Sequence, residues 1–167
     1  CPTTSLFSFT TIIEDDASFT MTPSCDGGTA NVTGLAGGAF VFETPPVDGA
    51  VIDAVTGTVT GGGYGTIYLV SYTTNGQCPT TNIFQLTSTE DDDSSFEMIS
   101  TCDGGTATIT VLVGGTFAFD TAPTDGAVID PSTGTITAGD YDTEYSVAYT
   151  TNGDCPTTTI VAVTSIV

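Results

Sequence analysis

The sequence repeats itself with a period of 77 residues, and no gap is needed to align the two copies. The segment Cys25–Ala30 returns as Cys102–Ala107, and Tyr72–Gly76 returns as Tyr149–Gly153. In total, 46 of the 77 aligned positions are identical. Both copies must therefore fold in the same way. Tandem arrays of small modules usually provide length and surface rather than chemistry.

The first residues carry a third, partial copy. Cys1-Pro2-Thr3-Thr4 recurs at Cys78 and again at Cys155, each time near the end of a copy. We therefore expect residues 1–12 to be the terminal strand of a preceding module. Residues 13–89 then form the first repeat and residues 90–167 the second, and we expect the array to continue on both sides.

The charge balance excludes several functions. The chain has no Lys, Arg or His against twenty carboxylates, which gives a net charge of −20. Such a chain cannot neutralise a nucleic-acid backbone or attach to an anionic membrane by charge. It also lacks the usual general base and the usual nucleophilic amine of enzymes. No stretch of about 18 apolar residues is present. We expect no nucleic-acid partner, no membrane insertion and no enzymatic activity.

The local pattern predicts β-strands. Apolar and polar residues alternate over short runs, and Gly, Asp, Asn and Pro separate the runs. No segment has a helical period, so we expect an all-β fold of tandem small antiparallel immunoglobulin-like β-sandwich modules, about seven strands each. In the second copy the predicted strands are Ser95–Thr101, Thr106–Leu112, Thr116–Asp120, Ala127–Ile129, Gly134–Ala138, Glu144–Thr150 and Thr159–Ser165.

The tyrosines have two interpretations. Tyr68, Val70 and Tyr72 are spaced by two and therefore share one face of a strand, as do their counterparts 77 residues later. A row of tyrosines can be a stacking platform for sugars. We favour core packing, with each hydroxyl hydrogen-bonded at the edge of the core, because a valine lies between the two rings.

Five cysteines allow two pairings that respect the repeat. One closes each module on itself, with Cys25 bonded to Cys78 and Cys102 to Cys155. The other bridges neighbours, with Cys1 bonded to Cys25 and Cys78 to Cys102. We favour the first, because a small module buries little surface and gains most from an internal disulfide. The cysteines stand singly and there is no His, which disfavours zinc. Disulfides indicate a location outside the cytoplasm.

Two acidic runs lie between predicted strands of successive modules and are the candidate metal sites. Ca²⁺ takes six to eight oxygen ligands, and clustered carboxylates with nearby carbonyls supply them. A structural Ca²⁺ there would stiffen the joint between modules. The alternative is a solvated acidic linker that charge repulsion extends. The candidate ligands are Glu14, Asp15 and Asp16, followed by Glu90, Asp91, Asp92 and Asp93.

Other carboxylates occupy predicted loops. Asp48 and Asp125 are interpreted mainly as turn residues whose side chains bond to their own backbone. Asp130–Gly134 predicts a type I turn followed by a glycine with positive φ.

The repeat resembles a known family. The motif Cys-Asp-Gly-Gly-Thr-Ala-x-x-Thr opens each copy, and Tyr-x-Val-x-Tyr-Thr-Thr-Asn-Gly-x-Cys-Pro lies near its end. Over Cys25–Thr87 and Cys102–Thr164 the chain is similar to the immunoglobulin-like repeats of giant secreted surface proteins of Bacteroidota, including gliding-motility adhesins of the SprB type. The resemblance implies export by the type IX route, attachment at the cell surface and a role in adhesion or gliding.

We therefore expect a structural and adhesive repeat segment of an extracellular bacterial surface protein. It would act as a disulfide-stapled stalk or fibre, with neighbouring repeats, surface glycans or other cells as partners. Two alternatives stay open. Residues Cys1–Ile12 could add a strand to a neighbouring subunit and so build a filament, or the module could bind carbohydrate.

Overall fold

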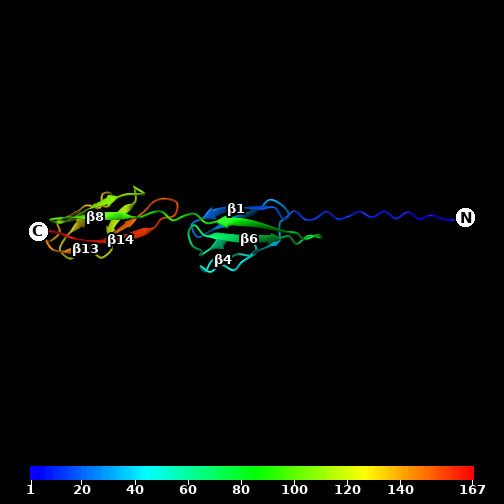
Figure 1. The fold of residues 1–167 in the computed structure, drawn as a ribbon, viewed down its shortest axis with the longest axis horizontal. Helices are drawn as coiled ribbons and strands as arrows, with labels where there is room; N and C mark the ends of the chain where they lie inside the picture. The colour runs from blue at the N-terminus through cyan, green and yellow to red at the C-terminus, as the bar shows by residue number, and fades with distance from the viewer. The chain divides into compact units, whose positions relative to one another are not determined.

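The structure, a computed structural model, describes residues 1–167 (Figure 1). It contains fourteen β-strands and no helix, so the predicted all-β fold class is confirmed. None of its elements is a helix able to cross a membrane. The chain divides into two compact units, Cys1–Thr89 and Glu90–Val167. Residues 1–18 precede the first strand and form no strand themselves.

The first module is a sandwich of two antiparallel sheets. One sheet has the strand order β1-β2-β5-β4 and the other has the order β3-β6-β7. This is the arrangement of a constant-type immunoglobulin domain, in which strands A, B, E and D face strands C, F and G. The strands are β1 (Phe19–Ser24), β2 (Gly27–Val32), β3 (Ala39–Phe42), β4 (Val51–Ile52), β5 (Val59–Thr60), β6 (Ile67–Thr73) and β7 (Thr81–Thr87).

The second module repeats this topology. β10, β13 and β14 form one sheet, β8 pairs with β9, and β11 pairs with β12. β12 also lies against β9, as β5 lies against β2 in the first module. Each predicted strand overlaps one observed strand, and the largest difference is at β9, which begins earlier than predicted. The strands are β8 (Phe96–Thr101), β9 (Gly104–Ile109), β10 (Thr116–Phe119), β11 (Val128–Ile129), β12 (Ile136–Thr137), β13 (Glu144–Thr150) and β14 (Thr158–Thr164).

Aromatic rings form the centre of the first core. Phe40 lies opposite Tyr72 in the β3–β6 register, and the two ring centroids are 4.5 Å apart. Phe19, on the other sheet, contacts Phe40 edge to face at 5.4 Å. The Tyr72 hydroxyl donates to the Leu35 carbonyl at 2.7 Å and accepts from the Gly38 N–H at 2.9 Å. The preferred interpretation of the tyrosines as core residues is therefore confirmed.

The second core has the same construction. The rings of Phe117 and Tyr149 are also 4.5 Å apart, and Phe96 lies edge to face against Phe117 at 5.4 Å. Tyr149 is fully buried. Its hydroxyl donates to the Leu112 carbonyl at 2.7 Å and accepts from the Gly115 N–H at 2.9 Å. Both modules thus bury a tyrosine whose polar atom has a donor and an acceptor.

The predicted turn before β12 is also present. The Asp130 carboxylate accepts the N–H groups of Ser132 at 2.8 Å and Thr133 at 2.9 Å. Gly134 follows with φ of 65°, in the left-handed region that favours glycine. A Cβ at Gly134 would also lie 3.0 Å from the ring of Phe117. The turn therefore needs glycine for its backbone and for its close approach to the core.

Replacing the buried tyrosine by phenylalanine tests this account of the core. Tyr149→Phe leaves a part-buried carbonyl and a part-buried N–H without their partner, so we expect the free energy of unfolding to fall by about 1–3 kcal/mol. Tyr141 is 65% exposed, so Tyr141→Phe should change stability by no more than about 0.5 kcal/mol. Urea unfolding of the two variants measures both values. Equal losses would contradict the role assigned to the Tyr149 hydroxyl.

Candidate functional site

The chain enters and leaves the first module at opposite ends, and each end carries one cysteine. At the entry, the Asp15 N–H donates to the carbonyl of Cys78, in the β6–β7 turn, at 3.0 Å. At the exit, the Thr89 N–H donates to the carbonyl of Ser24 at 2.9 Å, next to Cys25 in the β1–β2 turn. The six-residue strand β1 separates the two ends by about 20 Å, at about 3.3 Å per residue.

The second module has the same polarity. The Asp92 N–H donates to the carbonyl of Cys155 at 2.9 Å where the chain enters. The Ile166 N–H donates to the carbonyl of Thr101 at 2.9 Å where the chain leaves, next to Cys102. Each module therefore has an entry-end cysteine, in its β6–β7 or β13–β14 turn, and an exit-end cysteine, in its β1–β2 or β8–β9 turn.

This polarity overturns the predicted cysteine pairing. Cys25 and Cys155 are disulfide-bonded, whereas Cys1, Cys78 and Cys102 are free. Neither within-module bond, Cys25 to Cys78 or Cys102 to Cys155, is formed, and neither is the alternative of Cys1 to Cys25 with Cys78 to Cys102. A disulfide needs Cα atoms within about 7 Å, and the two ends of one module are much farther apart than that. The prediction that the chain contains a disulfide is confirmed.

Asp92, a predicted metal ligand, holds a loop of its own module. Its carboxylate accepts the Gly153 N–H at 2.9 Å and the Thr151 hydroxyl at 2.8 Å. Its backbone carbonyl accepts the Thr157 hydroxyl. One half-buried aspartate thus fixes both sides of the β13–β14 turn that carries Cys155.

Asp15 does the same in the first module. Its carboxylate accepts the Thr74 hydroxyl at 3.0 Å, and its carbonyl accepts the Thr80 hydroxyl. A Cβ placed on Gly76 would lie 2.4 Å from a carboxylate oxygen of Asp15, so a larger residue there would displace that carboxylate. The carboxylates of Asp15 and Asp92 are therefore engaged in internal hydrogen bonds at the entry ends of their modules.

The other predicted metal ligands are not brought together. Asp16 and Asp93 each accept a backbone N–H two residues on, from Ser18 and Ser95, both at 2.9 Å. The hydrogen bonds from these serines lower the pKa of Asp16 and Asp93. In residues 1–167 no three acidic or cysteine side chains gather into a group able to hold a metal ion. The calcium site stays a prediction. The remaining three, all exposed, are Glu14, Glu90 and Asp91.

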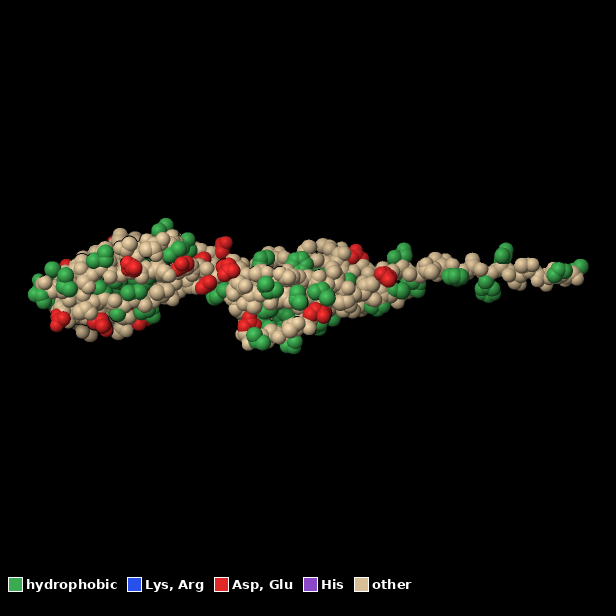
Figure 2. Space-filling view, in the orientation of Figure 1, with side chains coloured by type: hydrophobic (Ala, Val, Ile, Leu, Met, Phe, Trp, Pro, Cys, Tyr) green, Lys and Arg blue, Asp and Glu red, His purple; other side chains and the backbone are tan.

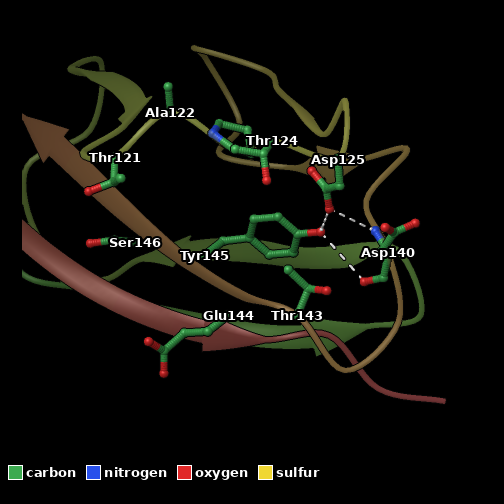
Figure 3. Close-up of a pocket in the computed structure, with 10 residues that line it drawn as sticks. Thr121, Ala122, Thr124, Asp125, Asp140, Thr143, Glu144, Tyr145 and Ser146 are labelled. Carbon is green, nitrogen blue, oxygen red and sulfur yellow. Dashed lines mark hydrogen bonds between the residues drawn. The ribbon is translucent and has the colours of Figure 1, made fainter.

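Asp125 lies at the edge of a cavity in the second module (Figure 3). Its carboxylate accepts the Tyr145 hydroxyl, the Asp140 N–H at 2.9 Å and the Ala127 N–H at 3.1 Å. The bond from Tyr145 is the main reason why the pKa of Asp125 falls to about 2. The cavity of about 520 Å³ is lined by Thr121, Ala122, Pro123, Thr124, Asp125, Asp140, Thr143, Glu144, Tyr145 and Ser146.

The first module has an equivalent cavity of about 500 Å³ with a different lining. Asp48 again accepts a tyrosine hydroxyl, from Tyr68, and a backbone N–H, from Gly63 at 2.8 Å. The bond from Tyr68 is again the first cause of a pKa of about 2 for Asp48. The aspartate–tyrosine pair is therefore common to both modules, while the rest of the lining is more apolar in the first module than in the second. At three lining positions Val47, Ile67 and Leu69 stand where the second module has Thr124, Glu144 and Ser146.

Sequence reasoning missed the partners of these carboxylates. Asp48 and Asp125 do bond to their own turns, as predicted, through the N–H groups of Ala50 and Ala127. Their tyrosine partners lie 20 residues away. The one available signal is that each aspartate and its partner are retained at the same spacing in both copies. Figure 2 shows acidic side chains spread over the visible surface of each unit, with no basic side chain beside them.

The sequence was compared with protein-family models and with curated proteins. No protein-family model matches the chain, and no curated protein matches it. The fold, the two ends of each module and the chemistry of the residues there are therefore the basis for a function.

Neutralising Asp92 tests its role in the entry-end turn. Asp92→Asn removes the negative charge that strengthens the hydrogen bonds from Gly153 and Thr151. It also replaces one acceptor oxygen by an amide NH2 group, which would face a backbone N–H. We expect the free energy of unfolding to fall by about 1–3 kcal/mol. Asp91→Asn is the matched control, because Asp91 is exposed and lies one residue earlier. Denaturant unfolding measures both, and similar values for the two variants would contradict the assignment.

The hydrogen bond between Asp125 and Tyr145 predicts how the stability of the second module changes at low pH. Because the folded-state pKa of Asp125 is lowered to about 2, its contribution to stability is present above the unfolded-state pKa of about 3.9 and is lost as the pH falls toward about 2. The stability difference between the natural protein and Tyr145→Phe should therefore be larger at about pH 5 than at about pH 2. Urea unfolding at both pH values measures it. A difference that does not change with pH would contradict the pairing.

Proposed function

We propose that the chain is a structural and adhesive repeat segment of an extracellular bacterial surface protein. In this role it forms part of a stalk or fibre that serves adhesion or gliding. The observation that carries the proposal is that each repeat copy is a complete sandwich entered at one end and left at the other. A module with its termini at opposite ends adds length with every copy, which is the requirement for a stalk.

Several properties support a location outside the cell. The chain carries a disulfide, and disulfides persist mainly in oxidising compartments. Its lack of Lys and Arg leaves no cleavage site for trypsin-like proteases. The motifs at Cys25–Ala30 and Tyr68–Pro79 resemble repeats of exported Bacteroidota surface proteins, as described above. The type IX export route and the gliding role follow from that resemblance alone.

The two rival functions have less support. A sugar platform built from the tyrosine rows is disfavoured, because Tyr68, Tyr72, Tyr145 and Tyr149 are all buried. Filament growth by insertion of Cys1–Ile12 needs a vacant strand position. The positions beside β6 and β13, where strands of the same sequence pattern lie, are filled by β7 and β14 of the same module.

Surface labelling tests the proposed function. Antibodies raised against the purified chain should label intact cells of the source bacterium, and external proteinase K should remove the label. Deletion of the coding region should reduce attachment to surfaces or cell spreading. Labelling only after permeabilisation would contradict the extracellular location. Normal attachment and spreading of the deletion strain would contradict the adhesive role.

The calcium prediction has its own test. If Ca²⁺ bridges the acidic run before β8, millimolar Ca²⁺ should raise the melting temperature relative to EDTA, and Mg²⁺ at matched ionic strength should not. The double variant Glu90→Gln/Asp91→Asn should lose that rise while melting normally in EDTA. It spares Asp92, which holds the entry-end turn. Equal melting temperatures in Ca²⁺, Mg²⁺ and EDTA would contradict the prediction.

A further inference from the structure

The outer face of the β3-β6-β7 sheet in the first module is apolar. Ile67 and Leu69 on β6 are 59% and 41% exposed, and they alternate with buried residues of the core. Val41 on β3 and Ile83 on β7 both lie opposite Ser71 in the register, so they share this outer face, and both are exposed. Exposed apolar side chains therefore cover all three strands of this sheet.

The apolar surface continues into the cavity of about 500 Å³ in the same module. Ile67 and Leu69 line the cavity from β6, and Pro45, Pro46 and the fully exposed Val47 line it from the β3–β4 loop. Ligand sites in proteins commonly have volumes of about 300–1,000 Å³ and are mostly apolar, with a few polar groups that fix the orientation of the ligand. The size and lining of this cavity are those of a binding site.

The second module shows that the fold does not need these apolar residues. At the positions of Val47, Ile67 and Leu69 it carries polar side chains, which line its own cavity (Figure 3): Thr124, Glu144 and Ser146. The strand register and the central ring contact of the core are nevertheless the same in both modules. Contiguous exposed apolar surface that folding does not require is typical of an interaction site.

Two carboxylates border this apolar face. Asp48 lines the cavity and is fixed there by hydrogen bonds from the Tyr68 hydroxyl and the Gly63 N–H. Glu43 is exposed at the end of β3, where its N–H donates to the Leu69 carbonyl at 3.0 Å. The chain has no Lys, Arg or His that could pair with either carboxylate. An occupant of this face therefore leaves both charges unpaired unless it brings positive charge of its own.

We propose that the outer β3-β6-β7 face of the first module binds a short extended segment of a partner protein that carries apolar side chains next to a Lys or Arg. The apolar side chains cover Ile67 and Leu69, and the cation lies beside Asp48. The outward positions of β6 from Ile67 to Ser71 span about 13 Å at about 3.3 Å per residue, which about four residues of extended chain cover. The inference goes beyond the proposed function, because it concerns one face of one module and does not depend on where the protein is located.

A second copy of the chain is a poorer occupant. Face-to-face pairing of two first modules would bury the apolar face, but it would also bring Asp48 and Glu43 toward the same carboxylates of the other copy. Neither copy has a cation, so these like charges would repel each other. Charge complementarity therefore favours a basic partner over self-association.

Peptide titrations of the isotope-labelled full chain, followed by NMR, test the proposal. The probe is the acetylated and amidated peptide Leu-Val-Leu-Lys. Two matched peptides are the controls: Leu-Val-Leu-Glu reverses the charge, and Ser-Thr-Ser-Lys removes the apolar side chains. We expect the probe to shift the amide signals of residues 67–71 and of Asp48, and to bind at least about tenfold more tightly than either control.

The second copy supplies the variants. Val47→Thr/Leu69→Ser introduces residues with which the second module folds, so we expect it to melt at nearly the temperature of the natural protein and to bind the probe at least about tenfold more weakly. Val55→Ser is the matched control. It also introduces the residue of the second copy, and Val55 is exposed but lies outside the β3-β6-β7 face, so probe affinity should not change.

Several results would overturn the proposal. They are equal affinity for the Lys and Glu peptides, no binding at millimolar probe, an unchanged affinity in Val47→Thr/Leu69→Ser, an equal loss in Val55→Ser, or signal shifts spread evenly over both modules. Signals of residues 67–71 that change with protein concentration alone would assign the face to a second copy and would also overturn it. None of these results bears on surface location or adhesion, so the proposed function is tested separately.

Discussion

The close contact between one tyrosine and two phenylalanines in each module is the interaction on which the rest of the fold depends. Phe19 from one sheet meets Phe40 and Tyr72 from the other, with ring centroids 5.4 to 5.9 Å from its own. Such ring pairs add to the burial of apolar area and prefer edge-to-face or tilted geometry. Because Phe40 and Tyr72 are also cross-strand neighbours, the contact fixes the β3–β6 register and the face that each sheet buries.

Once that register is fixed, the two ends of a module are fixed with it. β1 and β7 run between the ends, and the carbonyls of Cys78 and Ser24 accept hydrogen bonds from the chain as it enters and leaves. The exit-end and entry-end cysteines therefore cannot approach each other within one module. Neither module is closed by a disulfide of its own, because Cys78 and Cys102 are free, so a disulfide does not replace the hydrophobic core as the source of each module's stability. The aromatic packing supplies that stability instead.

The sequence was sufficient for features that depend on neighbouring residues. Alternation predicted the strands, the spacing of Tyr68 and Tyr72 predicted their burial, and Gly134 marked its turn. It was insufficient for features that depend on which loops meet. The acidic run identified Asp92 only as a candidate metal ligand and gave no sign of its hydrogen bond with Thr151, which is 59 residues away. The cysteine pairing failed for the same reason, because strand direction decides it and cysteine spacing does not show direction.

The absence of basic residues determines how this chain uses its carboxylates. No side-chain ion pair can form, so the ordered aspartates accept hydrogen bonds from backbone N–H groups and hydroxyls instead. Asp92 and Asp125 each anchor a loop in this way, and Asp130 shapes a turn. An ionised carboxylate is a stronger acceptor than a neutral one, so the negative charge strengthens the hydrogen bonds that hold these loops and also causes repulsion between modules.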